Sequence, residues 1–141
     1  MRLAALELAR LWLGTPYLEG ASQRGEGADC VGLIEGIARD LGLACPSRLA
    51  LKRDLLAAAQ AFLRPCKELG PGRILLLAQA PGGTPVHAAL MVEEGRLIHA
   101  HWTTGITLNR YGRWFQARTT HVFDWPHHPV LPPPSPQEGS D

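Results

Sequence analysis

The stretch GEGADCVGLIEGIARDLG, residues 25–42, places a cysteine between a glycine-rich approach and an apolar helical pattern. Apolar residues follow Cys30 at the three- and four-residue spacing of an amphipathic helix, and Gly42 is suited to cap its end. Cys30 is therefore predicted to begin a helix, where unpaired N–H groups and the helix dipole favour a thiolate. The glycines before it leave room for a substrate backbone. Cys30 is a candidate nucleophile; the alternative is a buried cysteine that only fills the core.

The residues before this stretch predict one more helix and a loop. Residues 1–13 are rich in Leu and Ala but include charged side chains, so they predict an amphipathic helix rather than a signal peptide. Pro16, in the GTPY turn of residues 14–17, prevents the helix from continuing. Residues 19–28, rich in glycine and polar side chains, predict a loop.

The residues after Gly42 predict one helix and then mainly strands. The expected order is a helix opening at Pro46-Ser47 and ending at Pro65, a buried strand over residues 73–79, strands on either side of a hairpin turn at Glu94-Gly95, another strand after a turn near Thr104-Gly105, and a last strand over residues 118–125. Helices followed by an antiparallel meander predict an α+β fold. Residues 1–125 form the predicted domain, and residues 126–141 a proline-rich disordered or extended tail.

Composition narrows the classes of function and the expected location. The 141 residues carry a formal net charge of +1, which gives no electrostatic reason to bind nucleic acid or an anionic membrane. No apolar run is long enough to span a bilayer. The odd number of cysteines and the missing signal pattern predict reduced thiols and cytoplasmic synthesis. Cys45 and Cys66 lie beside prolines without a glycine approach, and both are expected to be structural.

A nucleophilic cysteine needs a base, usually histidine, and a group that orients the base. His87 begins an apolar strand, and His99 lies in LIHAH on the next strand. A symmetric hairpin at Glu94-Gly95 brings His87 and His99 to neighbouring strands at a similar depth. Taken alone, each of these two histidines is more simply explained as a core or surface residue than as a catalytic one. Of the four remaining histidines, two are further candidates for the base, and two lie in the predicted tail and are set aside. They are His101 and His121, and His127 and His128, respectively.

Residues 13–42, LGTPYLEGASQRGEGADCVGLIEGIARDLG, resemble the start of the NlpC-type cysteine peptidases, which are papain-like cell-wall hydrolases. The shared pieces, in order, are the GTPY turn, Asp29-Cys30-Val31-Gly32, and His87 followed by Ile98-His99-Ala100. The resemblance covers most of residues 9–125 and implies a papain-like fold.

The resemblance also implies the roles of individual residues. Cys30 would be the nucleophile, His87 the base, and His99 the polar residue that orients the base. Tyr17 matches a tyrosine that lies beside the cysteine, and Asp29 and His101 are counted as near the site. Amide bonds in peptidoglycan stem peptides are the implied substrate, and no cofactor or metal is implied.

Within the family, the pattern is closest to the phage-tail and gene-transfer-agent branch. The missing signal peptide, the missing wall-binding module and the hydrophobic Val31 fit that branch. Partners in a phage-like particle, which would deliver the protein to the cell wall, are therefore expected. Two departures bear on the substrate: Val31 replaces a common serine, and Gly72-Arg73 replaces the usual Gly-Asp at the start of a strand.

Three other functions remain open from the residues. Cys30, His87, His99 and His101 offer ligands that suit zinc, although no short Cys-x-x-Cys or HExxH pair is present. A tail-assembly scaffold could keep the fold without activity. An acyltransferase would share the Cys-His-His set and differ in what accepts the acyl group.

Substrate contacts are expected from the loop that leads into Cys30. Its polar side chains Glu19, Arg24 and Glu26 are the nearest candidates, with Arg73 and Arg110 beyond it. The alternative is a surface loop with solvated charges. Of the tryptophans, Trp102 beside His101 is a candidate for the cleft wall, although an aromatic core residue is the simpler expectation.

Overall fold

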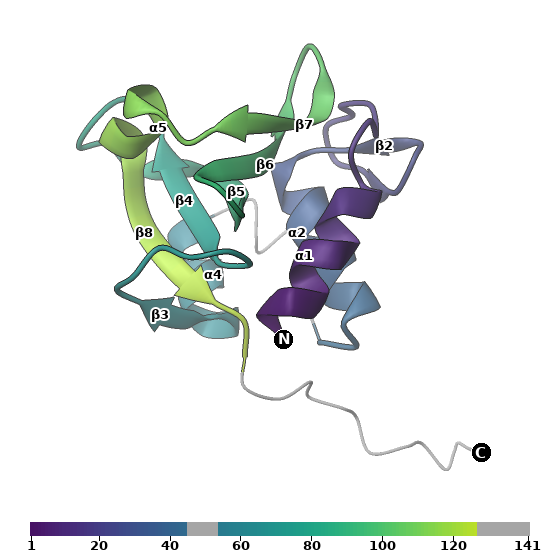
Figure 1. Ribbon diagram of the computed structural model, residues 1–141, viewed down its shortest axis with the longest axis horizontal. Coiled ribbons are helices and arrows are strands. Elements are labelled where there is room, and N and C mark those ends of the chain that lie inside the picture. The colour runs from purple at the N-terminus through teal and green to yellow at the C-terminus, as the bar shows by residue number, and fades with distance from the viewer. Residues whose placement is uncertain (45–53, 127–141) are drawn as a thin grey trace.

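The computed structural model describes residues 1–44 and 54–126, and Figure 1 shows their arrangement. The helices are α1 (Arg2–Leu11), α2 (Cys30–Asp40), α4 (Leu55–Phe62) and α5 (Arg113–Arg118). A small hairpin joins β1 (Ser22–Gln23) to β2 (Gly27–Ala28). The main sheet contains β3 (Arg64–Cys66), β4 (Ile74–Ala78), β5 (Pro85–Val92), β6 (Arg96–His101), β7 (Gly105–Arg110) and β8 (Thr119–Asp124).

The main sheet confirms the predicted antiparallel meander and adds to it. Its six strands have the order β3-β8-β4-β5-β6-β7, so β4 to β7 pair in sequence order. The last strand does not extend the meander beyond β7. Instead β8 returns to the other side of β4 and pairs antiparallel with both β4 and β3. The C-terminal strand thereby joins the middle of the sheet to its far edge.

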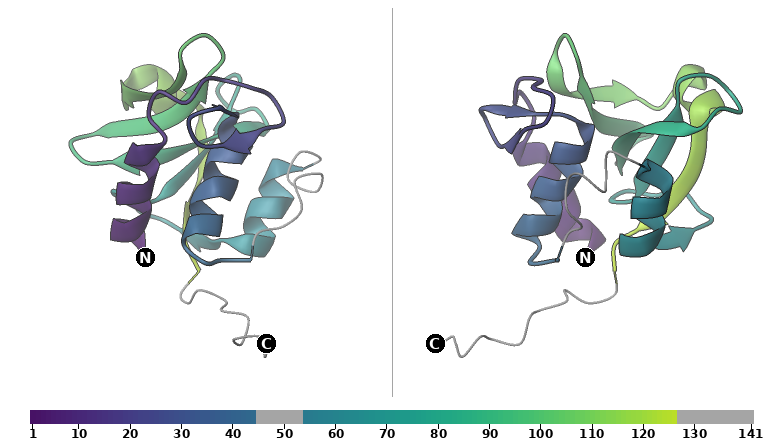
Figure 2. Two further views of the ribbon diagram at one scale, coloured as in Figure 1. Left: turned by 90° about the vertical axis from the view of Figure 1, so that its right-hand side faces the viewer. Right: turned by 180° about the vertical axis from the view of Figure 1, so that it is seen from behind.

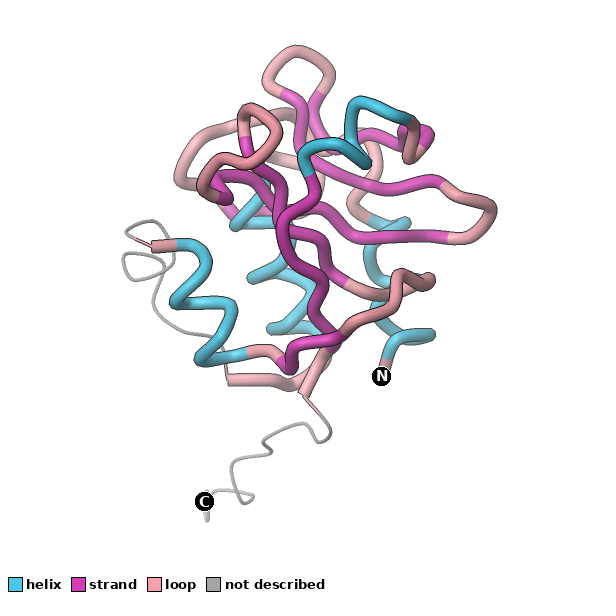
Figure 3. The backbone as a smooth tube through the Cα atoms, turned by 90° about the vertical axis from the view of Figure 1, so that its left-hand side faces the viewer, coloured by secondary structure: helices cyan, strands magenta, loops and turns pink. Residues whose placement is uncertain are grey.

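The helices α1, α2 and α4 cover one face of this sheet, and the short helix α5 lies against the other (Figures 2 and 3). Side chains of β4 alternate between the faces: Ile74 and Leu76 join the helix-side core, and Leu75 and Leu77 join the core beneath Phe115 of α5. This double burial explains why β4 is apolar throughout instead of alternating with polar residues. The α+β fold expected from the sequence is therefore present.

A glycine sets the distance between the two N-terminal helices. A Cβ atom added to Gly36 of α2 would lie 2.1 Å from a ring carbon of Trp12, which is 1% exposed. Only glycine lets the indole lie against the helix backbone at this position. Trp12 is therefore a core residue, and so is Trp125, which is equally buried.

Several local predictions need correction. The predicted loop of residues 19–28 contains β1 and β2. Asp54 is extended and caps α4, so one continuous helix does not run from Pro46-Ser47 to Pro65. The sequence also missed β3 and α5, which are only a few residues long and show no clear hydrophobic period. The last strand begins at Thr119 because the residues before it belong to α5.

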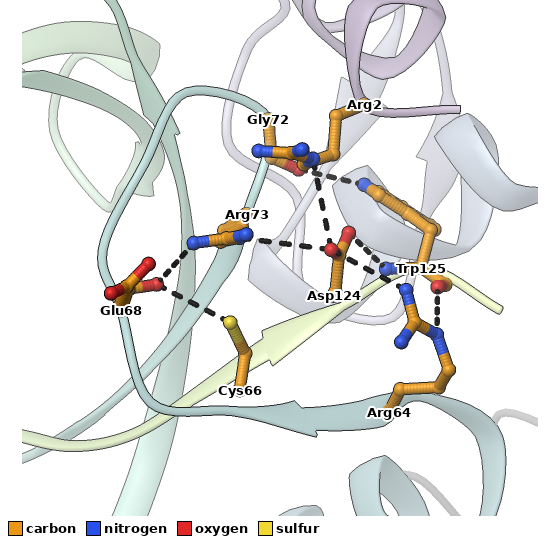
Figure 4. Close-up of polar contacts among 8 residues, drawn as sticks. All are labelled: Arg2, Arg64, Cys66, Glu68, Gly72, Arg73, Asp124 and Trp125. Atoms are coloured by element: carbon orange, nitrogen blue, oxygen red, sulfur yellow. Dashed lines mark hydrogen bonds and ion pairs between the residues drawn. The ribbon is translucent and has the colours of Figure 1, made fainter. Parts of the chain in front are cut away.

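A buried carboxylate joins the two ends of the domain (Figure 4). Asp124 is 8% exposed, and its Oδ2 atom lies 3.7 Å from Arg2, 3.5 Å from Arg64 and 3.6 Å from Arg73. The backbone N–H of Trp125 donates to its Oδ1 atom at 2.8 Å. These contacts connect α1, β3, β8 and the residue that precedes β4. The Arg73 that departs from the family's Gly-Asp pattern therefore belongs to a structural cluster.

Some sequence predictions lie outside the described residues. Cys45 and the predicted tail beyond Pro126 are among them. Within residues 1–44 and 54–126, no helix has the length and apolar character needed to cross a bilayer.

Candidate active site

Asp29 anchors the start of the helix that carries Cys30. Its Oδ1 atom accepts a hydrogen bond from the backbone N–H of Gly32 at 2.7 Å, which is the usual N-cap contact. Its Oδ2 atom accepts from the N–H of Gly20 at 2.9 Å. An N-cap of this kind is worth about 1 kcal/mol. Asp29, predicted to lie near the site, is therefore a buried cap that ties the preceding loop to α2.

Gly32, two residues after Cys30, lies where a larger residue would clash with the preceding loop. The carbonyl of Ala21 accepts from the N–H of Asp29 at 3.3 Å, and the Ser22 hydroxyl donates to the Gly32 carbonyl at 2.7 Å. A Cβ atom at Gly32 would lie 1.9 Å from the Ala21 oxygen. Glycine therefore lets the loop cross the first turn of α2 directly beside Cys30.

The GTPY turn positions Tyr17 through backbone pairing on both sides. The N–H of Gly14 donates to the carbonyl oxygen of Ile106 at 2.9 Å, and the N–H of Ile106 donates to the carbonyl oxygen of Thr15 at 2.8 Å. The turn therefore lies beside β7. On its other side, the N–H of Ala28 donates to Pro16 at 3.0 Å. The turn is thus held between β7 and β2. Tyr17 and Cys30 line the same two pockets.

The two central histidines lie on adjacent strands and contact each other. The β5–β6 register pairs Ala89 with His99. His87 comes two residues before Ala89 on β5, so both histidine rings are on the same face of the sheet. Nε2 of His87 lies 3.2 Å from Nδ1 of His99. The hairpin prediction of neighbouring histidines at a similar depth is confirmed.

Cys30, His87 and His99 line a common pocket of about 430 Å³, together with His101 and Trp102. A second pocket of about 520 Å³ also has Cys30 in its lining. Three residues line both: Tyr17, Cys30 and Val86. The half-buried Cys30 therefore borders both pockets.

The surroundings of the histidines favour their neutral forms. Burial, followed by the nearby His99 and His101, lowers the pKa of His87 to about 4, although Asp29 acts in the opposite direction. Burial also lowers the pKa of His99, against the raising effect of the hydrogen bond that His99 donates to Asn109. A neutral imidazole has one bare nitrogen, which can accept a proton from a thiol.

The pocket wall contains residues that the sequence did not single out. Nε2 of His99 lies 2.8 Å from Oδ1 of Asn109 on β7, and the ring of Phe115 on α5 packs edge-on against His99 with centroids 5.3 Å apart. Trp114 of α5 also lines the pocket. Alternation along β7 from the turn near Gly105 would have placed Asn109 on the histidine face. No local pattern pointed to α5.

Other candidate residues divide between the pocket and its surroundings. His101 lines the pocket, and its Nδ1 accepts from the N–H of Thr103 at 3.1 Å. Trp102 is 78% exposed and stacks on His101, so it is a wall of the pocket and not core. His121 contacts Thr120 on β8 and lines neither pocket beside Cys30.

The predicted substrate loop reaches the site at one end only. Glu19 lines the second pocket, whereas the exposed Arg24 and Glu26 line neither pocket. Cys66 is away from both pockets, and its thiol contacts the Glu68 carbonyl at 3.4 Å. Within the two described parts of the chain, no group of three or more His, Cys, Asp or Glu side chains is arranged to hold a metal ion.

Solved structures share this fold. A Bacillus cereus protein of the NlpC/P60 family superposes with a TM-score of 0.72 at 18% identity, over 89% of this chain and 40% of that one. The NlpC/p60 domain of the peptidoglycan hydrolase SagA gives 0.62 at 20% identity, over 88% and 98%. Ly7917, solved with the hydrolysing product of MDP, gives 0.58 at 16% identity, over 89% and 63%. This chain thus spans 40% of the length of the Bacillus cereus chain.

The sequence comparisons agree with the fold. No curated protein matches the chain significantly. The profile of the NlpC/P60 family, however, matches residues 14–124, a range that begins with the GTPY turn and includes Cys30, His87 and His99. Because this match extends over most of the chain and the architecture agrees with solved members, the chain belongs to the NlpC/P60 family.

Proposed function

We propose that this protein is a cysteine endopeptidase that hydrolyses amide bonds in peptidoglycan stem peptides. The observation that carries the proposal is the meeting of three groups in one pocket: a thiol at a helix N-terminus and two hydrogen-bonded histidines. Membership of the NlpC/P60 family supports it, as do the similar folds of a peptidoglycan hydrolase and of Ly7917 solved with the hydrolysing product of MDP.

The proposed reaction proceeds through an acyl-enzyme. His87 accepts the proton of Cys30, and the sulfur attacks the amide carbon to form a tetrahedral oxyanion. Collapse of this intermediate breaks the carbon–nitrogen bond, and His87 returns the proton to the departing amine. Water then attacks the thioester while His87 accepts one of its protons. Release of the carboxylate product restores the thiol.

Two further groups have roles in this proposal. His99 holds the ring of His87 through their 3.2 Å contact, so that one nitrogen of His87 remains available to the thiol. The backbone N–H of Cys30 belongs to the first turn of α2, at the positive end of the helix dipole, which suits it to stabilise the oxyanion.

Digestion of purified muropeptides tests the proposal. We expect the wild-type protein to release stem-peptide fragments, identified by mass spectrometry, and Cys30→Ala to release none. Cys66→Ala is the matched control because that thiol lies outside both pockets, and it should retain cleavage. Cleavage that survives in Cys30→Ala would show that the nucleophile is wrong.

The same digestion separates the alternatives. In water labelled with ¹⁸O, hydrolysis places the label in the new carboxylate, whereas acyl transfer to an added amine places the acyl group on nitrogen. A folded wild-type protein that cleaves no muropeptide favours the scaffold. Bound zinc that is lost in both His87→Gln and His99→Gln favours the metal site. Association with phage-tail or gene-transfer-agent proteins, and delivery in such a particle, remain predictions from the sequence.

A further inference from the structure

Asn109 lies at the end of a chain of hydrogen-bonding groups that begins in the pocket. Its Oδ1 atom is 2.8 Å from Nε2 of His99, and Nδ1 of His99 is 3.2 Å from Nε2 of His87. The three side chains come from the adjacent strands β7, β6 and β5. In the β6–β7 register Asn109 pairs with Leu97, which puts it on the same face as His99 and diagonal to it.

The direction of these hydrogen bonds follows from Asn109. An amide oxygen has no proton to donate, so Nε2 of His99 must carry the proton of this contact. Because burial keeps His99 in its neutral form, its Nδ1 is then a bare acceptor. The proton between the two rings therefore belongs to Nε2 of His87. The other nitrogen of His87, Nδ1, remains bare.

We infer that Asn109 is a positioning residue, which acts through His99 to select the tautomer of His87 that leaves Nδ1 as the base nitrogen. This inference rests on the proposed function for its catalytic consequence. Without the acceptor oxygen, His99 can protonate at either nitrogen. If Nδ1 of His99 carries a proton, Nε2–H of His87 no longer has an acceptor. His87 can then adopt either neutral tautomer.

The location of Asn109 makes the inference testable without unfolding the protein. Asn109 is exposed although its partner His99 is 6% exposed, so a change at this position leaves the core intact. Asn109→Leu removes the acceptor at similar size. Asn109→Asp keeps an acceptor oxygen and adds a negative charge. Arg110→Gln is the matched control, because Arg110 is the exposed neighbouring residue and, contrary to its place among the expected substrate contacts, lines neither pocket beside Cys30.

Hydrolysis kinetics give the first readout. We expect Asn109→Leu to lower kcat by about tenfold while KM changes by less than about twofold, because one hydrogen bond is lost that acts on the base and not on substrate binding. Asn109→Asp should restore kcat and move the acid limb of the pH profile to higher pH, since a carboxylate stabilises protonated imidazole. Wild-type kcat in Asn109→Leu overturns the inference.

Histidine ring NMR gives a second readout that needs no substrate. Long-range proton–nitrogen spectra should show wild-type His99 protonated at Nε2, and a mixture of tautomers in Asn109→Leu. Arg110→Gln should match the wild type. Protonation of wild-type His99 at Nδ1 overturns the inference even in an active enzyme. If the expected tautomers occur but muropeptides are not cleaved, the proposed function is wrong while the assignment of Asn109 to the tautomer is sustained.

Discussion

Nε2 of His87 lies 3.2 Å from Nδ1 of His99, across the boundary between two strands and beside the pocket that Cys30 lines. Neither ring can take a proton without affecting the other, because both are shielded from solvent and a second charge would repel the first. The contact therefore joins two properties that are usually measured separately, the stability of the fold against acid and the chemistry of the thiol.

The first prediction concerns the loss of stability on acidification. The pKa of His87 is lowered from 6.5 to about 4 in the folded protein. Between about pH 6.5 and about pH 4, His87 is therefore protonated in the unfolded chain but largely neutral in the folded chain. Protonation of His87 therefore does not reduce the free energy of unfolding above about pH 6.5, and it reduces it progressively as the pH drops toward 4. We expect His87→Gln to lose less Tm than the wild type between about pH 7.5 and about pH 4.5 in thermal unfolding. Equal losses would contradict the prediction.

The second prediction concerns the reactivity of the thiol. In a short exposure to iodoacetamide at neutral pH, Cys30 should be alkylated faster than Cys66 or Cys45, because the helix N-terminus favours its thiolate and the neutral His87 can accept its proton. Peptide mass spectrometry measures the three sites separately. In denaturant the difference should disappear. Equal labelling in the folded protein would mean that the thiol is not activated.

The third prediction concerns the packing of Gly36 against Trp12. In an exposed helix, Gly→Ala raises stability by about 1 kcal/mol. Here the added Cβ would lie 2.1 Å from a buried indole that cannot move away, and overpacking costs about 1–3 kcal/mol. We expect Gly36→Ala to lower the free energy of unfolding by about 2 kcal/mol in urea.

A double-mutant cycle checks the cause of that loss. In a Trp12→Leu background the smaller side chain leaves space, so Gly36→Ala should be neutral or stabilising. A loss of the same size in both backgrounds would show that Trp12 is not responsible.

The fourth prediction concerns Asp124. Asp124→Asn removes the charge that faces Arg2, Arg64 and Arg73, and we expect a loss of about 2–3 kcal/mol because these cations remain close together. Glu94→Gln is the control: its contact with Arg96 is exposed, and its removal should cost less than about 0.5 kcal/mol. Similar losses in the two variants, measured by urea unfolding, would contradict a special role for Asp124.

The fifth prediction separates the residues of the loop before Cys30. Glu19 lines the second pocket, so Glu19→Gln should raise KM for muropeptides by about threefold to tenfold as a polar contact weakens. The double variant Arg24→Gln/Glu26→Gln changes charges that line neither pocket and should leave KM within about twofold. The reverse ranking would move substrate recognition to the outer part of the loop.

The sequence by itself determined the features that depend on neighbours along the chain. The helix start at Cys30 was predictable because the helical period and its glycine signals lie within residues 25–42. The β5–β6 turn was predictable because Gly95 readily adopts the left-handed backbone that a tight hairpin needs, with a φ of 66°. The hairpin then places His87 close to His99 through strand geometry alone.

Only the tertiary structure decided which distant residues complete the site. The return of β8 to β4 depends on an apolar strand that is buried on both faces and therefore shows no alternation to reveal its partners. Trp12 is a core residue and Trp102 is part of the pocket wall. Both are tryptophans, so the difference between them depends only on what packs against each indole. The edge-on contact of Phe115 with His99 requires α5 to pack on the histidine face of the sheet, which no pattern within α5 indicates. These are contacts between residues far apart in the chain, and local sequence patterns do not encode their registration.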